Sequence, residues 1–151
     1  MTSTPVQVGS PPFHFRVDET WPAFPCGAPD GEAGGGACDS RDCVYVPARG
    51  PRPVQVFASN GKLISAWGDG LFKRPHGIFV GPNDTVYCTD DFGHAVHAFT
   101  TTGERLFTLG TGHPSDTGAT SIDYRTITRA AGPFNYPCNL AVGPSGDLYV
   151  A

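Results

Sequence analysis

The sequence predicts an all-β fold, specifically a partial β-propeller of about two and a half blades out of an expected six. The first observation is an internal repeat, because residues 72–87 return as residues 134–149 with matching Phe, Pro, Gly-Pro and Tyr positions. Self-similarity on this scale indicates one supersecondary unit that is used several times. The second is composition: 20 Gly and 15 Pro favour short strands and tight turns over helices. The third is that no segment keeps a helical periodicity.

The spacing of the repeats sets the length of the unit. Val46, Cys88 and Val150 end equivalent strands, and 42 residues separate the first pair, which is typical of one four-stranded propeller blade. The second pair is 62 residues apart, so about 20 residues are inserted between blades. We therefore expect a disordered leader (1–12), a lone strand and a Pro/Gly-rich lead (13–30), blade 1 (31–70), blade 2 (71–110), an inter-blade insert (111–133) and the truncated start of blade 3 (134–151).

The strands of the second blade are the best defined. Each is short, rich in β-branched or aromatic residues and bounded by turn residues, and they are expected at Gly77–Val80, Val86–Asp90, Ala95–Thr100 and Arg105–Leu109. The inner strand of the first blade should lie over residues 34–38, where three consecutive glycines weaken a strand pattern. The sequence offers no reason for these glycines.

Composition and charge exclude some functions. The net charge of −4 argues against a surface that binds nucleic acid. No basic segment followed by an apolar run opens the chain, and no apolar run approaches the roughly 20 residues that span a bilayer. We therefore expect a cytoplasmic protein without a membrane partner. Of the five cysteines, Cys88 and Cys138 are expected to be small buried thiols, with a zinc thiolate as the alternative for Cys138.

Several polar residues stand where strands begin or end. His76 opens an inner strand toward the expected central channel, where it is either a packed histidine or a ligand. Asp90 and Asp91 end the next strand, and carboxylates there more often cap a turn than act as a catalytic pair. His94 and His97 are three residues apart, so on a strand they would face opposite sides and are expected to be structural.

The repeat pattern Pro-x-Gly-Ile-x-Val-x-Pro followed by Val-Tyr-x-Thr-Asp resembles NHL repeats, which build six-bladed propellers. Three segments resemble more particularly the peptidyl-α-hydroxyglycine α-amidating lyase family: residues 44–50, residues 74–78, and Thr89-Asp90 with residues 94–96. The insert, with residues 114–118, 123–126 and 132–137, is similar to that of bacterial members. Members of that family cleave a C–N bond, giving a peptide amide and glyoxylate.

The resemblance implies a set of site residues. The family holds zinc with three histidines, with a tyrosine base and an arginine nearby, and a calcium ion bridges its inner-strand loops. By this resemblance His76 is a zinc ligand, Arg49 the catalytic arginine and the backbone carbonyl of Ile78 a calcium ligand. Arg52 is an alternative to Arg49. The remaining ligands and the base belong to later blades.

The insert is the remaining candidate feature. Loops longer than about 15 residues inside compact domains are often functional. Tyr124 and Arg125 are therefore candidates for a lid over the channel mouth or for contact with the substrate.

These observations predict the amino-terminal part of a lyase-like propeller that acts on a small-molecule or peptide substrate and is inactive as this chain alone. Whether the chain is an enzyme is left open by the sequence. The alternative is a non-catalytic NHL module that binds a protein or peptide, and a third interpretation is a truncated product without function. Open blade edges also favour self-association.

Overall fold

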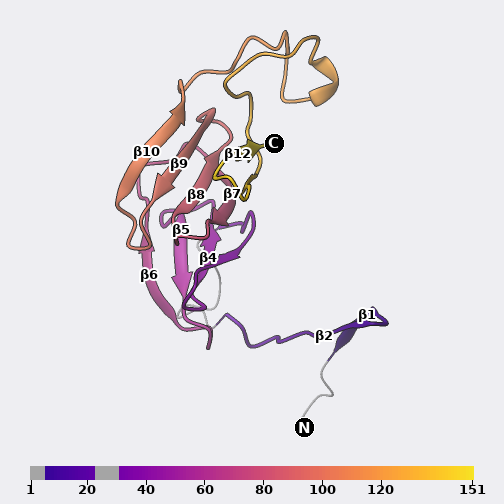
Figure 1. Ribbon diagram of the computed structural model, residues 1–151, viewed down its shortest axis with the longest axis vertical. Coiled ribbons are helices and arrows are strands. Elements are labelled where there is room, and N and C mark those ends of the chain that lie inside the picture. The colour runs from indigo at the N-terminus through magenta and orange to yellow at the C-terminus, as the bar shows by residue number, and fades with distance from the viewer. Residues whose placement is uncertain (1–5, 23–30) are drawn as a thin grey trace.

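A computed structural model describes residues 6–22 and 31–151, and it confirms the predicted all-β partial propeller. Two four-stranded antiparallel sheets lie next to each other, followed by a two-stranded hairpin, and a second hairpin near the N-terminus stands apart from the sheets (Figure 1). The stretches at residues 1–5 and 23–30, which include part of the expected leader and of the Pro/Gly-rich lead, lie outside the described residues.

Each four-stranded sheet is a simple meander. Blade 1 consists of β3 (Ala37–Cys38), β4 (Val44–Pro47), β5 (Val54–Phe57) and β6 (Leu63–Trp67). Blade 2 consists of β7 (Pro75–Val80), β8 (Val86–Asp90), β9 (Ala95–Phe99) and β10 (Arg105–Gly110), so its four expected strands are present with ends that differ by at most two residues. The start of blade 3 contributes β11 (Leu140–Val142) and β12 (Leu148–Val150).

The strand register identifies equivalent residues in the three units. A tyrosine on the second strand faces the inner strand each time: Tyr45 opposes Ala37, Tyr87 opposes Phe79 and Tyr149 opposes Ala141. Counting back three residues from each inner-strand partner makes Gly34, His76 and Cys138 equivalent. The repeat read from the sequence is therefore a repeat of backbone structure.

The apolar core lies between the two complete blades. Its buried members come from both sheets and are Tyr45, Val54, Val56, Ile78, Val86, Cys88 and Phe99. Trp67, at the end of the outermost strand of blade 1, packs on Phe99 of blade 2 with ring centroids 4.8 Å apart. Burial of these side chains supplies the main force that holds the blades together.

The N-terminal segment differs from the expectation. Residues 7–10, expected to be disordered, form β1 (Gln7–Ser10), which pairs with β2 (Phe13–Arg16), so the strand predicted to stand alone is one arm of a hairpin. The reversal runs through Pro11 and Pro12, residues that favour turns. Farther along, Trp21 docks the chain on blade 1 by donating a hydrogen bond to the Ser59 carbonyl at 3.1 Å.

The insert contains little regular structure. Its single described helical turn is the 3-10 helix η1 (Tyr124–Thr126), which begins where the Asp123 carboxylate accepts a hydrogen bond from the Arg125 N–H. Within the described parts of the chain, no helix has both the length and the apolar character needed to cross a membrane.

Candidate functional site

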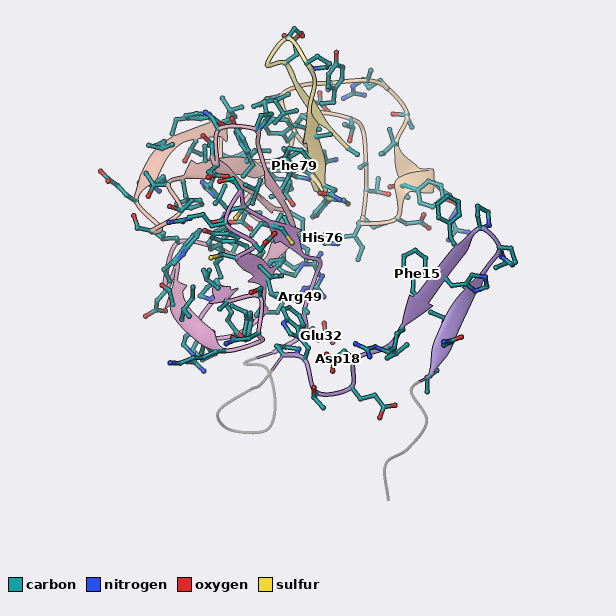
Figure 2. All side chains as sticks on the ribbon, turned by 60° about the horizontal axis from the view of Figure 1, so that its bottom comes forward. Phe15, Asp18, Glu32, Arg49, His76 and Phe79 are labelled. Atoms are coloured by element: carbon teal, nitrogen blue, oxygen red, sulfur yellow. The ribbon has the colours of Figure 1, made fainter. Side chains whose placement is uncertain are left out.

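Two of the candidate site residues lie at one edge of the blades. His76 lies near the start of β7, and Arg49 follows the end of β4. The start of an inner strand and the end of the second strand lie at the same edge of a blade, and in blade 1 the last residue of β4 pairs there with Val54. An isolated bridge between Ala33 and Ala48 continues blade 1 in this direction. In Figure 2, Glu32, Arg49 and His76 follow one another along the side of the blades that faces the β1–β2 hairpin. The topology thus places at one edge two of the residues that the sequence singled out.

His76 is held by a backbone carbonyl of the next unit. Its Nδ1 atom lies 2.9 Å from the carbonyl oxygen of Cys138. A carbonyl can only accept, so Nδ1 carries a proton, and in the neutral imidazole Nε2 then keeps its lone pair. Histidines that bind metals commonly donate their other ring N–H to a carbonyl in this way. The half-buried imidazole is therefore in the tautomer that a metal ligand requires.

The same carbonyl joins two blades. The Thr89 hydroxyl donates to the Cys138 carbonyl at 3.0 Å and accepts from the N–H of Gly77 at 2.7 Å. Thr89 is fully buried, so this arrangement satisfies polar groups that water does not reach. The orientation of His76 thus depends on the junction between β7 and the segment before β11.

Arg49 is paired on the surface. Its Nη1 atom donates to Oε2 of Glu32 at 2.9 Å, and its backbone N–H donates to the Glu32 carbonyl at 3.0 Å. The Glu32 side chain is 80% exposed and that of Arg49 is 32% exposed. Exposed pairs of this kind are weak, so Arg49 can exchange Glu32 for another carboxylate at low cost. Glu32 carried no sequence signal, because its pairing depends on the bridge between Ala33 and Ala48.

Asp90 caps a turn, as expected from its position. Its carboxylate accepts from the N–H groups of Lys73 (2.8 Å), Arg74 (2.9 Å) and Gly93 (2.9 Å). Burial by itself would raise the pKa of Asp90, but these hydrogen bonds and the neighbouring His97 outweigh it and lower the pKa to about 2. The carboxylate is therefore charged at neutral pH and structural.

Asp91 is also structural. It is 2% exposed and binds the Arg74 guanidinium, whose Nε lies 2.8 Å from Oδ1, while the guanidinium carbon lies 3.5 Å from the centre of the Phe92 ring. The prediction that Asp90 and Asp91 are not a catalytic pair is consistent with these contacts.

The two other histidines of blade 2 are both buried, but only one is on a strand. His97 lies on β9, with Nδ1 2.9 Å from the Thr108 hydroxyl and its ring edge-on to Phe72. His94 precedes β9 in a turn with φ of 48°, so the expectation that both sit on one strand was wrong. Burial lowers the pKa of His94, whose Nδ1 accepts from the Tyr136 N–H at 3.3 Å.

The remaining candidates are less well placed. The Ile78 side chain is in the core, and β7 pairs it with Cys88. The role of its carbonyl as a calcium ligand stays a prediction. Tyr124 is 77% exposed, and Arg125 binds Asp123 with an Nε–Oδ1 distance of 2.9 Å, so both lie on the surface of the insert. Their role as a lid stays a prediction.

The cysteines divide by environment. Cys88 is fully buried as expected, and burial raises the pKa of its thiol well above the usual range. Cys138 is exposed, and the expectation that it is buried was wrong. It precedes β11, and its Sγ atom donates to the Tyr136 carbonyl at 3.3 Å. In the described ranges, no cluster of three or more His, Cys, Asp or Glu side chains could hold a metal ion.

The fold and its solved neighbours define the class of protein. No family model matches the sequence. The virginiamycin B lyase of Staphylococcus aureus superposes with a TM-score of 0.60 at 12% identity, over 91% of this chain and 41% of the lyase chain. A streptogramin B lyase structure gives a TM-score of 0.59 at 14% identity, over 91% of this chain and 37% of that one. At such identities the likeness concerns the fold alone, which is that of part of a β-propeller.

Curated relatives specify the type of propeller. NHL repeat-containing protein 3 of Mus musculus is 29% identical over 153 residues, which cover 90% of this chain and 39% of the relative. Peptidyl-alpha-hydroxyglycine alpha-amidating lyase 1 of Drosophila melanogaster is 32% identical over 117 residues, or 75% of this chain and 20% of the relative. The chain therefore spans less than half of the relatives it matches, and it forms part of an NHL-type propeller.

Proposed function

We propose that these residues form part of a lyase-like propeller that cleaves the C–N bond of a peptidyl-α-hydroxyglycine, with His76 as one ligand of a zinc ion. The observation that carries the proposal is the 2.9 Å contact between His76 Nδ1 and the Cys138 carbonyl, which leaves Nε2 as the free acceptor. The similarity to the Drosophila lyase supports it.

His76 is proposed to bind the zinc ion and has no other part in the reaction. A catalytic zinc needs about three protein ligands and an open position. The described residues supply His76 and no cluster able to complete the set, so this chain alone does not fit the metal. The further ligands, and a structural calcium held in part by the Ile78 carbonyl, are assigned to blades beyond these residues.

Arg49 is proposed to bind the carboxylate that ends the substrate. Its guanidinium lies at the same edge as His76, and among the described residues it pairs with the exposed Glu32. A planar guanidinium matches a carboxylate with two parallel hydrogen bonds. Exchange of Glu32 for the substrate carboxylate would fix the end of the peptide next to His76. Tyr124 and Arg125 are proposed to contact the substrate from the insert.

The test measures glyoxylate release from a blocked peptidyl-α-hydroxyglycine with zinc added. We expect the 151-residue chain to give no turnover, and the complete propeller to lose about 100-fold in kcat/KM with His76→Ala. His113→Ala is the matched control, since His113 lies exposed in the insert. Zinc-dependent turnover by the chain alone, or full activity of His76→Ala in the complete propeller, would contradict the proposal.

A second candidate is a non-catalytic NHL module that binds a protein or peptide. The specific observation in its favour is that NHL repeat-containing protein 3 matches 90% of this chain, against 75% for the lyase. A non-catalytic module predicts that zinc has no effect on any activity of the complete propeller. In either case the proposed partner is a peptide or a small molecule. We also propose self-association through strand edges such as that of β12, which sedimentation would detect.

A further inference from the structure

His76 lies in an irregularity of the pairing between β7 and β8. Between two paired positions β7 carries one residue more than β8, so that His76 and Gly77 stand opposite the single residue Thr89. An extra residue of this kind is a β-bulge, which bends the strand and turns the side chains next to it. Bulges are common beside active sites. The residue opposite the bulge, Thr89, is therefore the one on β8 that stands nearest in register to His76.

The side chain of Thr89 holds a backbone carbonyl in place. Its hydroxyl accepts from the Gly77 N–H at 2.7 Å, so the hydroxyl proton is available for an acceptor. Two carbonyl oxygens are near, and that of Cys138 at 3.0 Å is closer than that of Gly77 at 3.5 Å. The Cys138 carbonyl thus accepts from the Thr89 hydroxyl and, at 2.9 Å, from Nδ1 of His76. Since Thr89 is 0% exposed, water does not replace its hydroxyl there.

Gly77 makes room for this carbonyl. A Cβ atom on Gly77 would overlap the carbonyl oxygen of Cys138, so no other residue type fits at this place without a shift of the backbone. The carbonyl of the third unit therefore reaches into blade 2 through the gap left by a missing side chain. Gly77, Thr89 and His76 together determine where its oxygen lies.

The repeat shows that the fold does not require the Thr89 hydroxyl. The strand register makes Pro47 of blade 1 and Ala151 of the third unit equivalent to Thr89, and neither has a hydroxyl. Both units still form their inner hairpins. The hydroxyl occurs in the unit that carries a histidine at the start of the inner strand, which links it to His76 more closely than to the blade as such.

A fixed carbonyl acts on the choice between two forms of the ring. A neutral imidazole carries its proton on Nδ1 or on Nε2, and the hydrogen bond that one nitrogen makes decides which form is present. A hydrogen bond stabilises a form only by the amount that exceeds the entropy lost in ordering its partners. Because the Thr89 hydroxyl already orders the Cys138 carbonyl, the bond to Nδ1 of His76 carries less of that cost.

We infer that Thr89 is a positioning residue for His76: its buried hydroxyl fixes the Cys138 carbonyl, and the fixed carbonyl holds the imidazole with its proton on Nδ1 and its lone pair on Nε2. The inference rests on the proposed function only for the use that is made of Nε2. The placement of the ring is a property of this chain, and it needs no metal.

The experiment determines the tautomer of His76 in the 151-residue chain without added metal. The ¹⁵N shifts of the two ring nitrogens are measured at about pH 8.5, where an ordinary imidazole is neutral. We expect the proton on Nδ1 in the wild type. Thr89→Val keeps the shape of the side chain without the hydroxyl, and it is expected to lower the ratio of the Nδ1–H to the Nε2–H form about three- to tenfold. A proton on Nε2 in the wild type, or an unchanged ratio in folded Thr89→Val, would overturn the inference.

Two further variants separate the hydroxyl from the packing of the side chain. Thr89→Ser keeps the hydroxyl and is expected to keep the wild-type ratio at His76. Thr108→Val is the matched control, because the Thr108 hydroxyl lies 2.9 Å from Nδ1 of His97 in the same blade. It should change the signals of His97 and leave those of His76 as they are. Where Thr89→Val does not fold, Thr89→Ala takes its place with the same expectation. A Thr89→Ser chain that behaves like Thr89→Val, or an equal change at His76 in Thr108→Val, would overturn the inference.

This inference and the proposed function fail in different ways. An Nδ1–H ring that Thr89→Val releases, together with a complete propeller that shows no zinc-dependent lyase activity, would contradict the proposed function and leave the role of Thr89 standing. Lyase activity that depends on His76, together with an unchanged tautomer ratio in Thr89→Val, would do the reverse.

Discussion

Gly34 lies directly against the backbone carbonyl of His76, so close that a Cβ atom on Gly34 would overlap the carbonyl oxygen. The glycine belongs to blade 1 and the histidine to blade 2, and the two residues are equivalent in the strand register. The glycine run that weakens the inner strand of blade 1 therefore permits close packing of adjacent inner strands. Gly77 is in a similar situation, since its Cβ would lie 2.8 Å from Asn139 Oδ1.

The first prediction concerns this contact. Gly34→Ala is expected to lower the free energy of unfolding by about 1–3 kcal/mol, because the backbone of β7 has to move. Gly35→Ala is the matched control, since a Cβ there meets no atom within 4 Å. The measurement is chemical unfolding of both variants. An equal loss of stability in the two variants would show that the close approach of Gly34 to the His76 carbonyl is not what makes Gly34→Ala destabilising.

The second prediction concerns pH. The folded-state pKa of Asp90 is about 2, below its usual 3.8, so the folded state holds the ionised form more strongly than the unfolded state does. Its contribution, about 2 kcal/mol, is present above pH 4 and is lost as the pH falls from 4 to 2. Asp90→Asn should flatten the dependence of the unfolding midpoint on pH in this range, whereas the exposed Asp69→Asn should not.

The third prediction concerns Arg74. Arg74→Met leaves the buried Asp91 carboxylate without its charged partner and is expected to cost about 3–5 kcal/mol of stability. Arg74→Lys keeps the charge but loses the paired hydrogen bonds and the stacking on Phe92, so it should fall between wild type and Arg74→Met. Thermal denaturation distinguishes the three proteins, and a stable Arg74→Met would refute the assignment.

The fourth prediction concerns thiol reactivity. Cys38 and Cys138 are exposed, whereas Cys88 is buried and its pKa is raised. Iodoacetamide should therefore modify Cys38 and Cys138 in the native protein, and Cys88 only after denaturant is added. Peptide mass spectrometry of the labelled protein locates the modified sites. Rapid native labelling of Cys88 would mean that the interface between the blades opens readily.

Much of the fold could be predicted because propeller repeats encode their structure locally. The β-branched and aromatic runs and the turn residues of blade 2 placed its strands to within two residues. The N-terminal hairpin was missed because residues 7–10 carry a Gly and a Ser and little strand pattern of their own. Their pairing with β2 depends on the turn between them.

The candidate site could be predicted only in part. His76 and Arg49 were singled out from the repeat pattern and the family resemblance. The Cys138 carbonyl and Glu32 were not, because a backbone acceptor 62 residues away and a surface carboxylate leave no pattern in the sequence.

The sequence by itself determined the repeating unit, the strand order and the position of the insert, since each depends on neighbouring residues and on a period that is visible in the chain. Only the tertiary structure decided which tautomer His76 adopts and why Gly34 has no side chain. Those properties arise where one blade meets the next, and contacts between residues far apart in sequence follow from packing geometry.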